Sequence, residues 1–281
     1  FPRADAWAGA TLPAVLKSHG VETRCICEAP EQLGKLLDDF STAVTLDAAD
    51  AVREGLPNAE QLVDEAIRQL RTLKDSPRWL LWLHARGLPP SPDESEQQPA
   101  VSETMTALDE GLGRLLAAVK ELESDEELLF VVTAARGDLP PYPAVIQQDA
   151  RPLAEPRVHT PLLARLSSAD RGRRRSFVQT VDLAPTLLDW FQRPPESMRC
   201  EGRSWLPALG AGSEDPRAYV CYGDTRGAAI RTADFCLVAD DLEAAAQETS
   251  GPHGVRLFVK PDDFWEVDDA AAQFPEQAIE L

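Results

Sequence analysis

Buried strand segments alternate with amphipathic helices along the first 212 residues, and this alternation restricts the fold more than any other feature of the sequence. The runs Trp79–Leu83 and Leu128–Val132 are continuously apolar, which is typical of strands buried on both faces. Between them, apolar residues recur every three or four positions over 101–122 and predict one long helix. The alternation predicts an α/β/α sandwich around a mainly parallel central sheet.

The other segments before residue 212 continue this alternation. Thr11 is expected to cap a helix that Gly20 closes, and Asn58 is expected to cap a second amphipathic helix. The segment 87–99 is rich in Pro, Ser and Glu and is expected to form a long loop. Strands are predicted at 21–27, 41–46 and 159–166, and short helices at 30–40 and 182–190.

The pattern changes after residue 212. Short strand candidates with turns between them follow at 219–222, 228–231, 235–238 and 255–259. They predict a small antiparallel subdomain over 213–281, following an α/β core over 1–212.

The balance of charges restricts the partners of the chain. Its 281 residues include 28 Lys and Arg against 47 Asp and Glu, a net charge of -19. Such a surface repels a phosphate backbone, which argues against general binding to nucleic acid or to an anionic membrane, and no nucleic-acid partner is expected. No apolar run approaches the roughly 20 residues of a membrane span, which excludes a transmembrane protein.

The five cysteines are an odd number spread thinly over the chain, unlike a disulfide scaffold or a zinc ribbon. Buried reduced thiols are the expected state, and a metal or redox role is the alternative. Reduced thiols and the absence of a signal segment weakly favour a cytoplasmic protein. The chain begins at Phe1, which fits a processed chain or a fragment of a longer one.

Few residues offer catalytic chemistry, because the motifs for dinucleotides, nucleotides, zinc hydrolases and serine hydrolases are missing. His84 ends a buried strand, where α/β proteins place their sites, although a lone histidine is more often a hydrogen-bonded structural residue. The basic run Arg171–Arg175 suits a solvated turn or, alternatively, an anion contact.

Several segments match one known family in order. Val181–Asp189 reads VDLAPTLLD and is followed by EGRSWL at Glu201–Leu206. This combination resembles a stretch of the sulfatases, members of the alkaline phosphatase superfamily. Further segments with the same likeness and order begin at Thr11, Leu80, Asp109, Leu128, Thr160 and Leu257.

The resemblance implies a sulfuric ester hydrolase that holds one divalent metal, usually calcium. However, the family's Asp-His or Asp-Asn metal pair in the turn after a strand is Ala135-Arg136 here. Alanine has no ligand atom, and an arginine cation repels a metal. The family's nucleophile motif, Cys/Ser-x-Pro-x-Arg, is also missing. No catalytic residue, metal ligand or cofactor is therefore predicted, and calcium or another divalent metal is expected only in an active protein.

Three hypotheses follow from the resemblance and its departures. The first is a sulfatase-like domain that has lost catalysis and acts as a binding or structural module. The second is a divergent sulfuric or phosphoric ester hydrolase whose catalytic N-terminal segment lies outside this chain. The third is an anion-binding module that uses Arg136, with His84 as a second candidate ligand contact. The expected partner is an unknown protein or an anionic small molecule. The resemblance implies that the family's first portion, which contributes central strands, would precede Phe1; if this chain is all there is, the sheet is expected to be rearranged or one of its edges capped by another chain.

Overall fold

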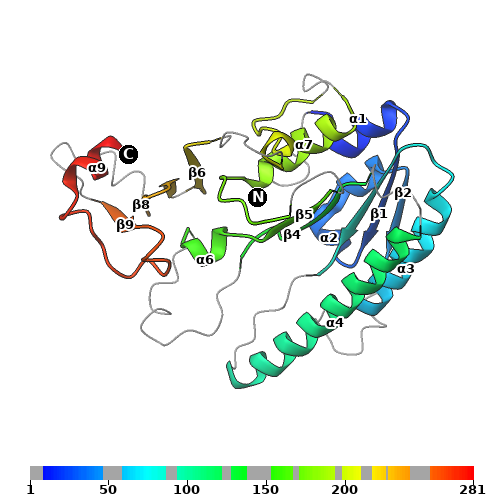
Figure 1. The fold of residues 1–281 in the computed structure, drawn as a ribbon, viewed down its shortest axis with the longest axis horizontal. Helices are drawn as coiled ribbons and strands as arrows, with labels where there is room; N and C mark the ends of the chain where they lie inside the picture. Colours follow the sequence, from blue (N-terminus) through cyan, green and yellow to red (C-terminus); the bar gives the residue numbers. More distant parts are fainter. Residues whose placement is uncertain are drawn as a thin grey trace. The chain divides into compact units, whose positions relative to one another are not determined.

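The computed structural model describes residues 9–46, 59–86, 94–121, 128–137, 153–166, 171–193, 198–209, 217–225, 227–240 and 254–281 (Figure 1). The chain forms two compact units. The first unit comprises Phe1–Leu128 and Leu187–Cys200, and the second comprises Leu129–Thr186 and Glu201–Leu281. The predicted boundary at residue 212 stays a prediction. Within the described ranges, no helix is both long and apolar enough to cross a membrane.

A three-stranded parallel sheet forms the centre of the first unit. Its strands are β1 (Glu22–Cys27), β2 (Thr42–Thr45) and β3 (Trp79–His84), in the order β2-β1-β3. β1 lies in the middle, and its residues Cys25–Cys27 are completely buried. The predicted parallel sheet is confirmed in this unit.

Helices of the first unit begin where the sequence predicts. In α1 (Leu12–Ser18), the hydroxyl of Thr11 accepts a hydrogen bond from the amide of Ala14, and Gly20 follows with a φ of 78°. α3 (Ala59–Leu73) buries a stripe of apolar residues, namely Leu62, Val63, Ala66, Leu70 and Leu73. It lies beside α4 (Glu94–Lys120), as Figure 1 shows. Asn58, the expected cap of α3, lies outside the described residues.

Three details of the first unit differ from the predictions. The helix expected over 30–40 divides into α2 (Pro30–Leu33) and the 3₁₀ helix η2 (Gly34–Asp39), because Gly34 adopts a φ of 52° that interrupts the α-helix. α4 begins at Glu94, inside the segment predicted as a loop. β3 was expected to be buried on both faces, yet each of its residues is only partly buried.

The second unit begins with an antiparallel strand pair. β4 (Phe130–Thr133) pairs with β5 (Leu162–Arg165), so that Phe130 lies opposite Arg165. This pair adds an antiparallel element to a core whose sequence predicts mainly parallel strands. Short helices lie between and after these strands, namely α6 (Glu155–Val158), η5 (Thr180–Asp182), α7 (Leu183–Trp190) and η7 (Leu206–Leu209). The part of α7 from Leu187 onward belongs to the first unit.

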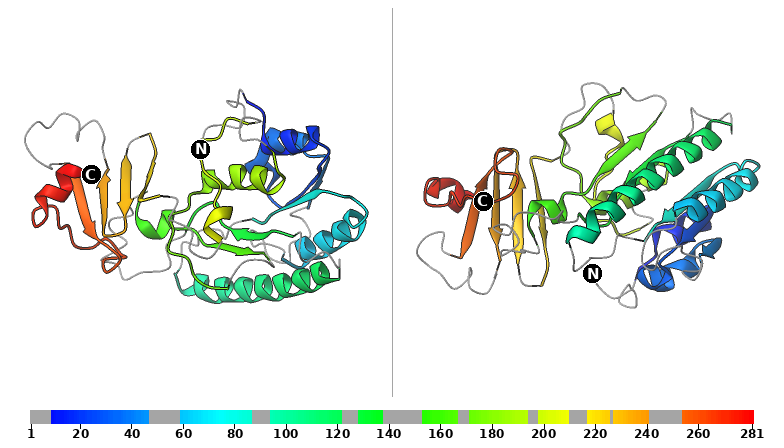
Figure 2. Two further views of the ribbon diagram at one scale, coloured as in Figure 1. Left: turned by 45° about the horizontal axis from the view of Figure 1, so that its top comes forward. Right: turned by 90° about the horizontal axis from the view of Figure 1, so that it is seen from below.

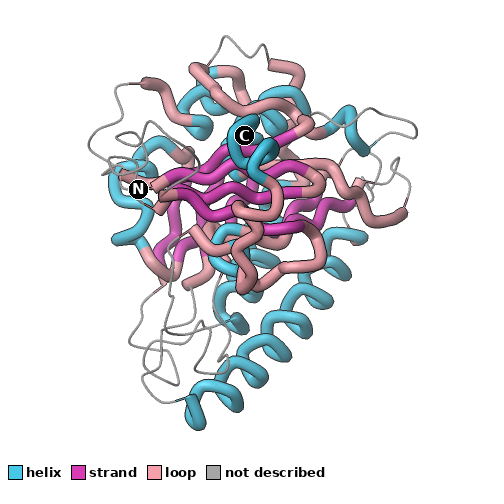
Figure 3. Tube along the Cα trace, turned by 90° about the vertical axis from the view of Figure 1, so that its left-hand side faces the viewer, coloured by secondary structure: helices cyan, strands magenta, loops and turns pink. Residues whose placement is uncertain are grey.

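A four-stranded antiparallel sheet completes the second unit and confirms the prediction for the C-terminal region (Figure 2). Its strands follow chain order: β6 (Tyr219–Gly223), β7 (Ala228–Thr232), β8 (Phe235–Ala239) and β9 (Val255–Val259). One face packs Cys236, Val238 and Phe258 against Leu153. The other face packs Leu257 against Ala278 of α9 (Pro275–Glu280), and Figure 3 shows α9 in front of these strands.

Candidate functional site

The carboxyl ends of the three parallel strands meet at one edge of the sheet in the first unit. Cys27 at the end of β1 lies opposite Thr45 of β2 and His84 of β3. Binding sites of open α/β sheets form outside this edge. The structure therefore places His84 at the strand end where a site is expected, while its role in binding stays a prediction.

His84 is partly buried and has a polar partner from α2. Its Nε2 lies 2.9 Å from Oε1 of Gln32, a contact in which the ring nitrogen carries the proton. Burial lowers the pKa of His84, and the charge of Glu31 opposes this effect. The imidazole is therefore mainly neutral at pH 7 and donates through Nε2.

Glu28 and Arg86 join the segments that leave β1 and β3. The amide of Arg86 donates to Oε2 of Glu28 at 2.9 Å, and its guanidinium donates to the carbonyl oxygen of Glu28 at 3.1 Å. The same guanidinium lies 3.5 Å from the carboxylate of Glu31. Because Glu28 is 7% exposed, the amide of Arg86 supplies a hydrogen bond to a buried carboxylate. Arg86 and Glu28 thus fix the two strand ends relative to each other.

The cysteines of β1 show no sign of reactive chemistry. All five cysteines of the chain are free, and Cys25 and Cys27 are completely buried. The expected burial holds for these two and for Cys236, but Cys200 is only partly buried and Cys221 is exposed. They pack with Phe40 and with Trp82 of β3. Burial, together with the neighbouring Cys27, raises the pKa of Cys25 to about 12, and burial likewise raises that of Cys27. Both thiols therefore remain protonated at neutral pH, which makes them poor nucleophiles and metal ligands.

Arg136 lies in the turn that follows β4, in the second unit. It is exposed, as is Ala135, and the next residue anchors the turn to the backbone of α6. The amide of Gly137 donates to the carbonyl oxygen of Arg157 at 2.8 Å. A Cβ at position 137 would lie 2.1 Å from the carbonyl oxygen of Pro156, so the close approach requires glycine. Arg136 therefore presents a guanidinium to solvent from a turn whose backbone is held in place.

The two residues predicted to contact a ligand belong to different units: His84 lies in the first and Arg136 in the second. Sequence reasoning did not select Glu28 or Gln32 as members of the polar edge of the parallel sheet. The position of Glu28 directly after a buried strand was a usable signal. Gln32 had no such signal, because its contact depends on how α2 folds back toward β3. The four arginines of the run 171–175 are all exposed.

The most specific motif of the sequence, VDLAPTLLD at Val181–Asp189, has a structural role. Asp182 is 1% exposed as a residue, and its carboxylate accepts backbone hydrogen bonds from Gln179 and Arg203, each at 2.8 Å. Arg217 donates to both of its oxygens. Burial alone would raise the pKa of Asp182, but these contacts, led by Arg217, lower it below its usual value.

The same motif fixes the segment EGRSWL. The hydroxyl of Thr186 donates to the carbonyl oxygen of Asp182 at 2.6 Å and accepts from the amide of Trp205 at 3.1 Å. A Cβ on Gly202 would lie 2.1 Å from the carbonyl oxygen of Val181. The two segments VDLAPTLLD and EGRSWL therefore pack closely and are hydrogen-bonded to each other. The side chains of Asp182 and Thr186 serve this structural role.

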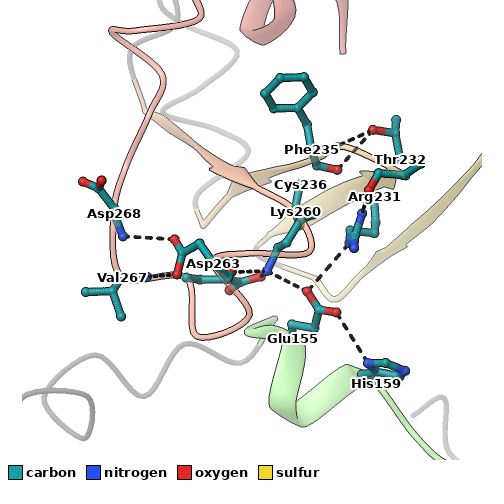
Figure 4. A network of polar contacts seen from close by, with 12 residues as sticks. Glu155, His159, Arg231, Thr232, Phe235, Cys236, Lys260, Asp263, Val267 and Asp268 are labelled. Carbon is teal, nitrogen blue, oxygen red and sulfur yellow. Dashed lines mark hydrogen bonds and ion pairs between the residues drawn. The ribbon is translucent and has the colours of Figure 1, made fainter.

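A second buried polar network joins α6 to the C-terminal sheet (Figure 4). The ammonium group of Lys260 lies 2.6 Å from Oε2 of Glu155 and 3.4 Å from Oε1 of Glu266, and the Lys260 side chain is 1% exposed. Glu155 also contacts His159 at 3.4 Å and Arg231 at 3.7 Å. Burial alone would raise the pKa of Glu155, but His159, Lys260 and Arg231 together lower it to about 2.

This network fits a structural role. The lysine donates to the carbonyl oxygen of Asp263 at 2.8 Å, which fixes the turn after β9. Tyr222 lies nearby and contacts the thiol of Cys236 at 3.4 Å. Burial raises the pKa of Tyr222 and raises that of Cys236 to about 11, so both groups stay neutral. Across the described part of the chain, no group of three or more His, Cys, Asp and Glu side chains is placed to hold a metal ion.

Comparison with known proteins identifies relatives of this chain. The family model described as Sulfatase matches residues 8–193. Human N-sulphoglucosamine sulphohydrolase is 28% identical over 137 residues, an alignment that covers 44% of this chain and 26% of the relative. The chain therefore spans about a quarter of the length of that curated relative.

Solved structures with a similar fold cover most of the chain. Ps i-CgsB superposes with a TM-score of 0.66 at 14% identity and covers 96% of this chain, which spans 71% of that protein. A protein in the alkaline phosphatase superfamily from Vibrio parahaemolyticus superposes with a TM-score of 0.60 at 17% identity, with coverages of 96% and 69%. At this low identity the likeness shows the fold alone.

Proposed function

The chain belongs to the sulfatase family, and from this membership we propose that it is a sulfatase-like module that has lost ester hydrolysis and acts by binding. The observation that carries the proposal is the pair Ala135-Arg136 in the turn after β4. Catalysis by a divalent metal requires anionic or neutral ligand atoms at that metal. An alanine methyl group and an exposed guanidinium provide neither.

The residues of this turn do not fit a divalent cation. Guanidinium is a permanent cation with five N–H donors and no acceptor, so it repels the metal and favours an anion. Its planar donor fork matches the oxygens of sulfate or phosphate. We therefore assign Arg136 to contact an anionic group of the ligand, and no reaction step is derived through a metal.

The polar groups at the edge of the parallel sheet also favour binding over catalysis. The Glu28 carboxylate accepts from the amide of Arg86, and the His84 ring is hydrogen-bonded to Gln32. In the described part of the chain, both groups are thus engaged by backbone or amide partners of the fold. These contacts stabilise the strand ends and present half-buried polar atoms at the sheet edge.

A divergent sulfuric or phosphoric ester hydrolase is the second candidate. It is favoured by the match to N-sulphoglucosamine sulphohydrolase, since about three-quarters of that protein lies beyond the part this chain matches. In this case another segment would supply the nucleophile and the metal ligands.

Hydrolysis assays and metal analysis separate these candidates. The purified chain is loaded with calcium, magnesium, manganese or zinc, desalted, and assayed with 4-nitrophenyl sulfate and 4-nitrophenyl phosphate. The proposal expects less than about 0.1 metal per chain and no hydrolysis above the buffer rate. Hydrolysis that is abolished in Arg136→Ala would overturn it in favour of the hydrolase.

Calorimetry tests the role of Arg136 itself. Titration with sodium sulfate and sodium phosphate is expected to show binding that Arg136→Ala weakens about tenfold. Arg71→Ala, at an exposed position of α3, is the matched control and leaves binding unchanged. Equal binding by both variants would remove Arg136 from the site.

A further inference from the structure

The turn that carries Arg136 is hydrogen-bonded directly to Arg157 of α6. The amide of Gly137, which follows Arg136 in the chain, donates to the carbonyl oxygen of Arg157 at 2.8 Å. Such a bond places the Cα atoms of the two bonded residues roughly 5–6 Å apart. The Cα atoms of Arg136 and Arg157 are then at most about 10 Å apart, which is less than the combined reach of two arginine side chains. One ligand can therefore contact both residues.

The carboxylate on the same short helix is engaged elsewhere. Glu155 of α6 contacts Lys260, Arg231 and His159, as Figure 4 shows. On a helix, residues four positions apart are neighbours, whereas residues two positions apart do not face each other. Glu155 and His159 therefore share one side of α6, and Arg157 leaves the helix on a different side. The positive charge of Arg157 is not part of this network.

The side chain of Arg157 contains a buried donor that the fold does not satisfy. Its Nε–H group is removed from solvent and, within the ranges that the structure describes, has no hydrogen-bond partner. Buried donors are nearly always paired in proteins, because an unpaired one destabilises the folded state. An arginine that served only the fold would be expected to meet a carboxylate or a carbonyl oxygen there. An anionic ligand would supply the acceptor that this Nε–H group lacks.

Two guanidinium groups also select the charge of the anion. Both are permanent cations, so a ligand that contacts Arg136 and Arg157 meets two positive charges. A sulfate ester carries a single negative charge, whereas a phosphate monoester carries about 1.5 to 2 negative charges at pH 7. The additional charge of the phosphate strengthens its attraction to both guanidinium groups. The donor fork of each arginine also matches a pair of phosphate oxygens.

We propose that Arg157 is a second anion-binding residue beside Arg136, and that the two arginines together bind the phosphate group of a phosphate monoester. The exposed guanidinium of Arg136 contacts the phosphate from the solvent side, and the partly buried Arg157 donates to it through Nε. This inference rests on the proposed anion contact of Arg136, to which it adds a second residue and the chemical class of the ligand.

Two probes that differ in charge test the class of the ligand. Phenyl phosphate and phenyl sulfate share the same apolar group, and only the phosphate approaches two negative charges at neutral pH. In calorimetric titrations of the full chain, phenyl phosphate is expected to bind at least about tenfold more tightly than phenyl sulfate. Equal affinities, tighter binding of phenyl sulfate, or no binding of phenyl phosphate would each overturn the proposal.

Single variants test the two arginines separately. Arg157→Met has a similar length without the donors and the charge, and it is expected to weaken binding of phenyl phosphate about tenfold, as is Arg136→Ala. Arg71→Met, at an exposed position of α3, is the control and leaves binding unchanged. Weakening by Arg136→Ala alone would overturn this inference and leave the proposed function in place. Unchanged binding in both variants would overturn this inference together with the proposed role of Arg136.

Thermal unfolding separates a binding role of Arg157 from a structural one. Without ligand, Arg157→Met removes an unpaired buried donor, so its melting temperature is expected to equal or exceed that of the parent chain. Phenyl phosphate is expected to raise the melting temperature of the parent chain and to have less effect on the variant. Arg157→Lys keeps the positive charge and is expected to restore part of this effect. A marked fall in the melting temperature of Arg157→Met without ligand would assign the side chain to the fold and overturn the proposal.

Discussion

Arg217 donates one hydrogen bond to each carboxylate oxygen of Asp182, although 35 residues separate them in the sequence. The Asp182 side chain is 2% exposed and that of Arg217 is 12% exposed, so the pair is almost completely removed from water. Because Asp182 also holds the backbone of Gln179 and Arg203, the pair links three separate segments of the second unit. This relationship explains why the motif VDLAPTLL needs its aspartate.

Removal of Arg217 is expected to destabilise the second unit strongly. Arg217→Ala leaves the buried Asp182 carboxylate without its cation, which costs about 3–5 kcal/mol in comparable pairs. Urea unfolding followed by circular dichroism measures the change. Arg114→Ala removes an exposed pair with Asp64 and serves as the control, with an expected change below about 1 kcal/mol. Similar losses in the two variants would contradict a special role for the buried pair.

Two glycine substitutions are expected to act in opposite directions. Gly202→Ala places a methyl group 2.1 Å from the carbonyl oxygen of Val181. The segments around Val181 and Gly202 must move apart, so the melting temperature falls. Gly113→Ala meets no atom within 4 Å and lies inside α4, where alanine is favoured by roughly 0.5–1 kcal/mol. Thermal unfolding by calorimetry compares both with the parent chain. A Gly202→Ala protein as stable as the parent would mean that the segment around Val181 relaxes freely.

Acid is expected to destabilise the C-terminal sheet through Glu155. The pKa of Glu155 is lowered from 4.5 to about 2 in the folded chain, so the unfolded state binds its proton first as the pH falls. The contribution of this group is complete above pH 4.5 and is lost between pH 4.5 and 2. We therefore expect the stability difference between the parent chain and Glu155→Gln to shrink across that interval. Urea midpoints measured from pH 7 to pH 2 test this, and a constant difference would contradict the assignment.

Thiol labelling is expected to distinguish exposed from buried cysteines. Cys221 is exposed, whereas Cys25, Cys27 and Cys236 are buried, and burial raises the pKa of each of these three thiols. Cys221 should react first with 5,5′-dithiobis(2-nitrobenzoic acid) at pH 8, because the thiolate is the reacting form. The buried thiols should react only on addition of denaturant. Cys221→Ser should remove the fast phase and leave a slower reaction at Cys200, which is partly buried and whose pKa burial raises. A fast phase that persists when Cys200 is also changed to Ser would show that a buried thiol is accessible.

Local patterns predicted most secondary structure because their causes are local. The N-cap at Thr11, the strand of Val21–Cys27 and the four short strands after residue 212 depend on hydrogen bonding and burial within a few residues. The prediction of one helix over 30–40 was wrong because Gly34 interrupts it. The positive φ of Gly34 leaves no trace in the pattern of apolar residues. The start of α4 at Glu94 was hidden by a composition typical of loops.

The sequence by itself determined the fold class and the family, because the period of apolar residues sets element type and the VDLAPTLL segment is specific. It also determined that Ala135-Arg136 stands at the end of a strand. Only the tertiary structure decided which polar groups meet. Asp182 pairs with Arg217, and Glu155 pairs with Lys260. The members of each pair are distant in the sequence, so the spacing of neighbouring residues does not predict these contacts. The partner of a buried charge and the position of a strand at the edge of its sheet both depend on long-range packing, so they emerge only when the chain is folded.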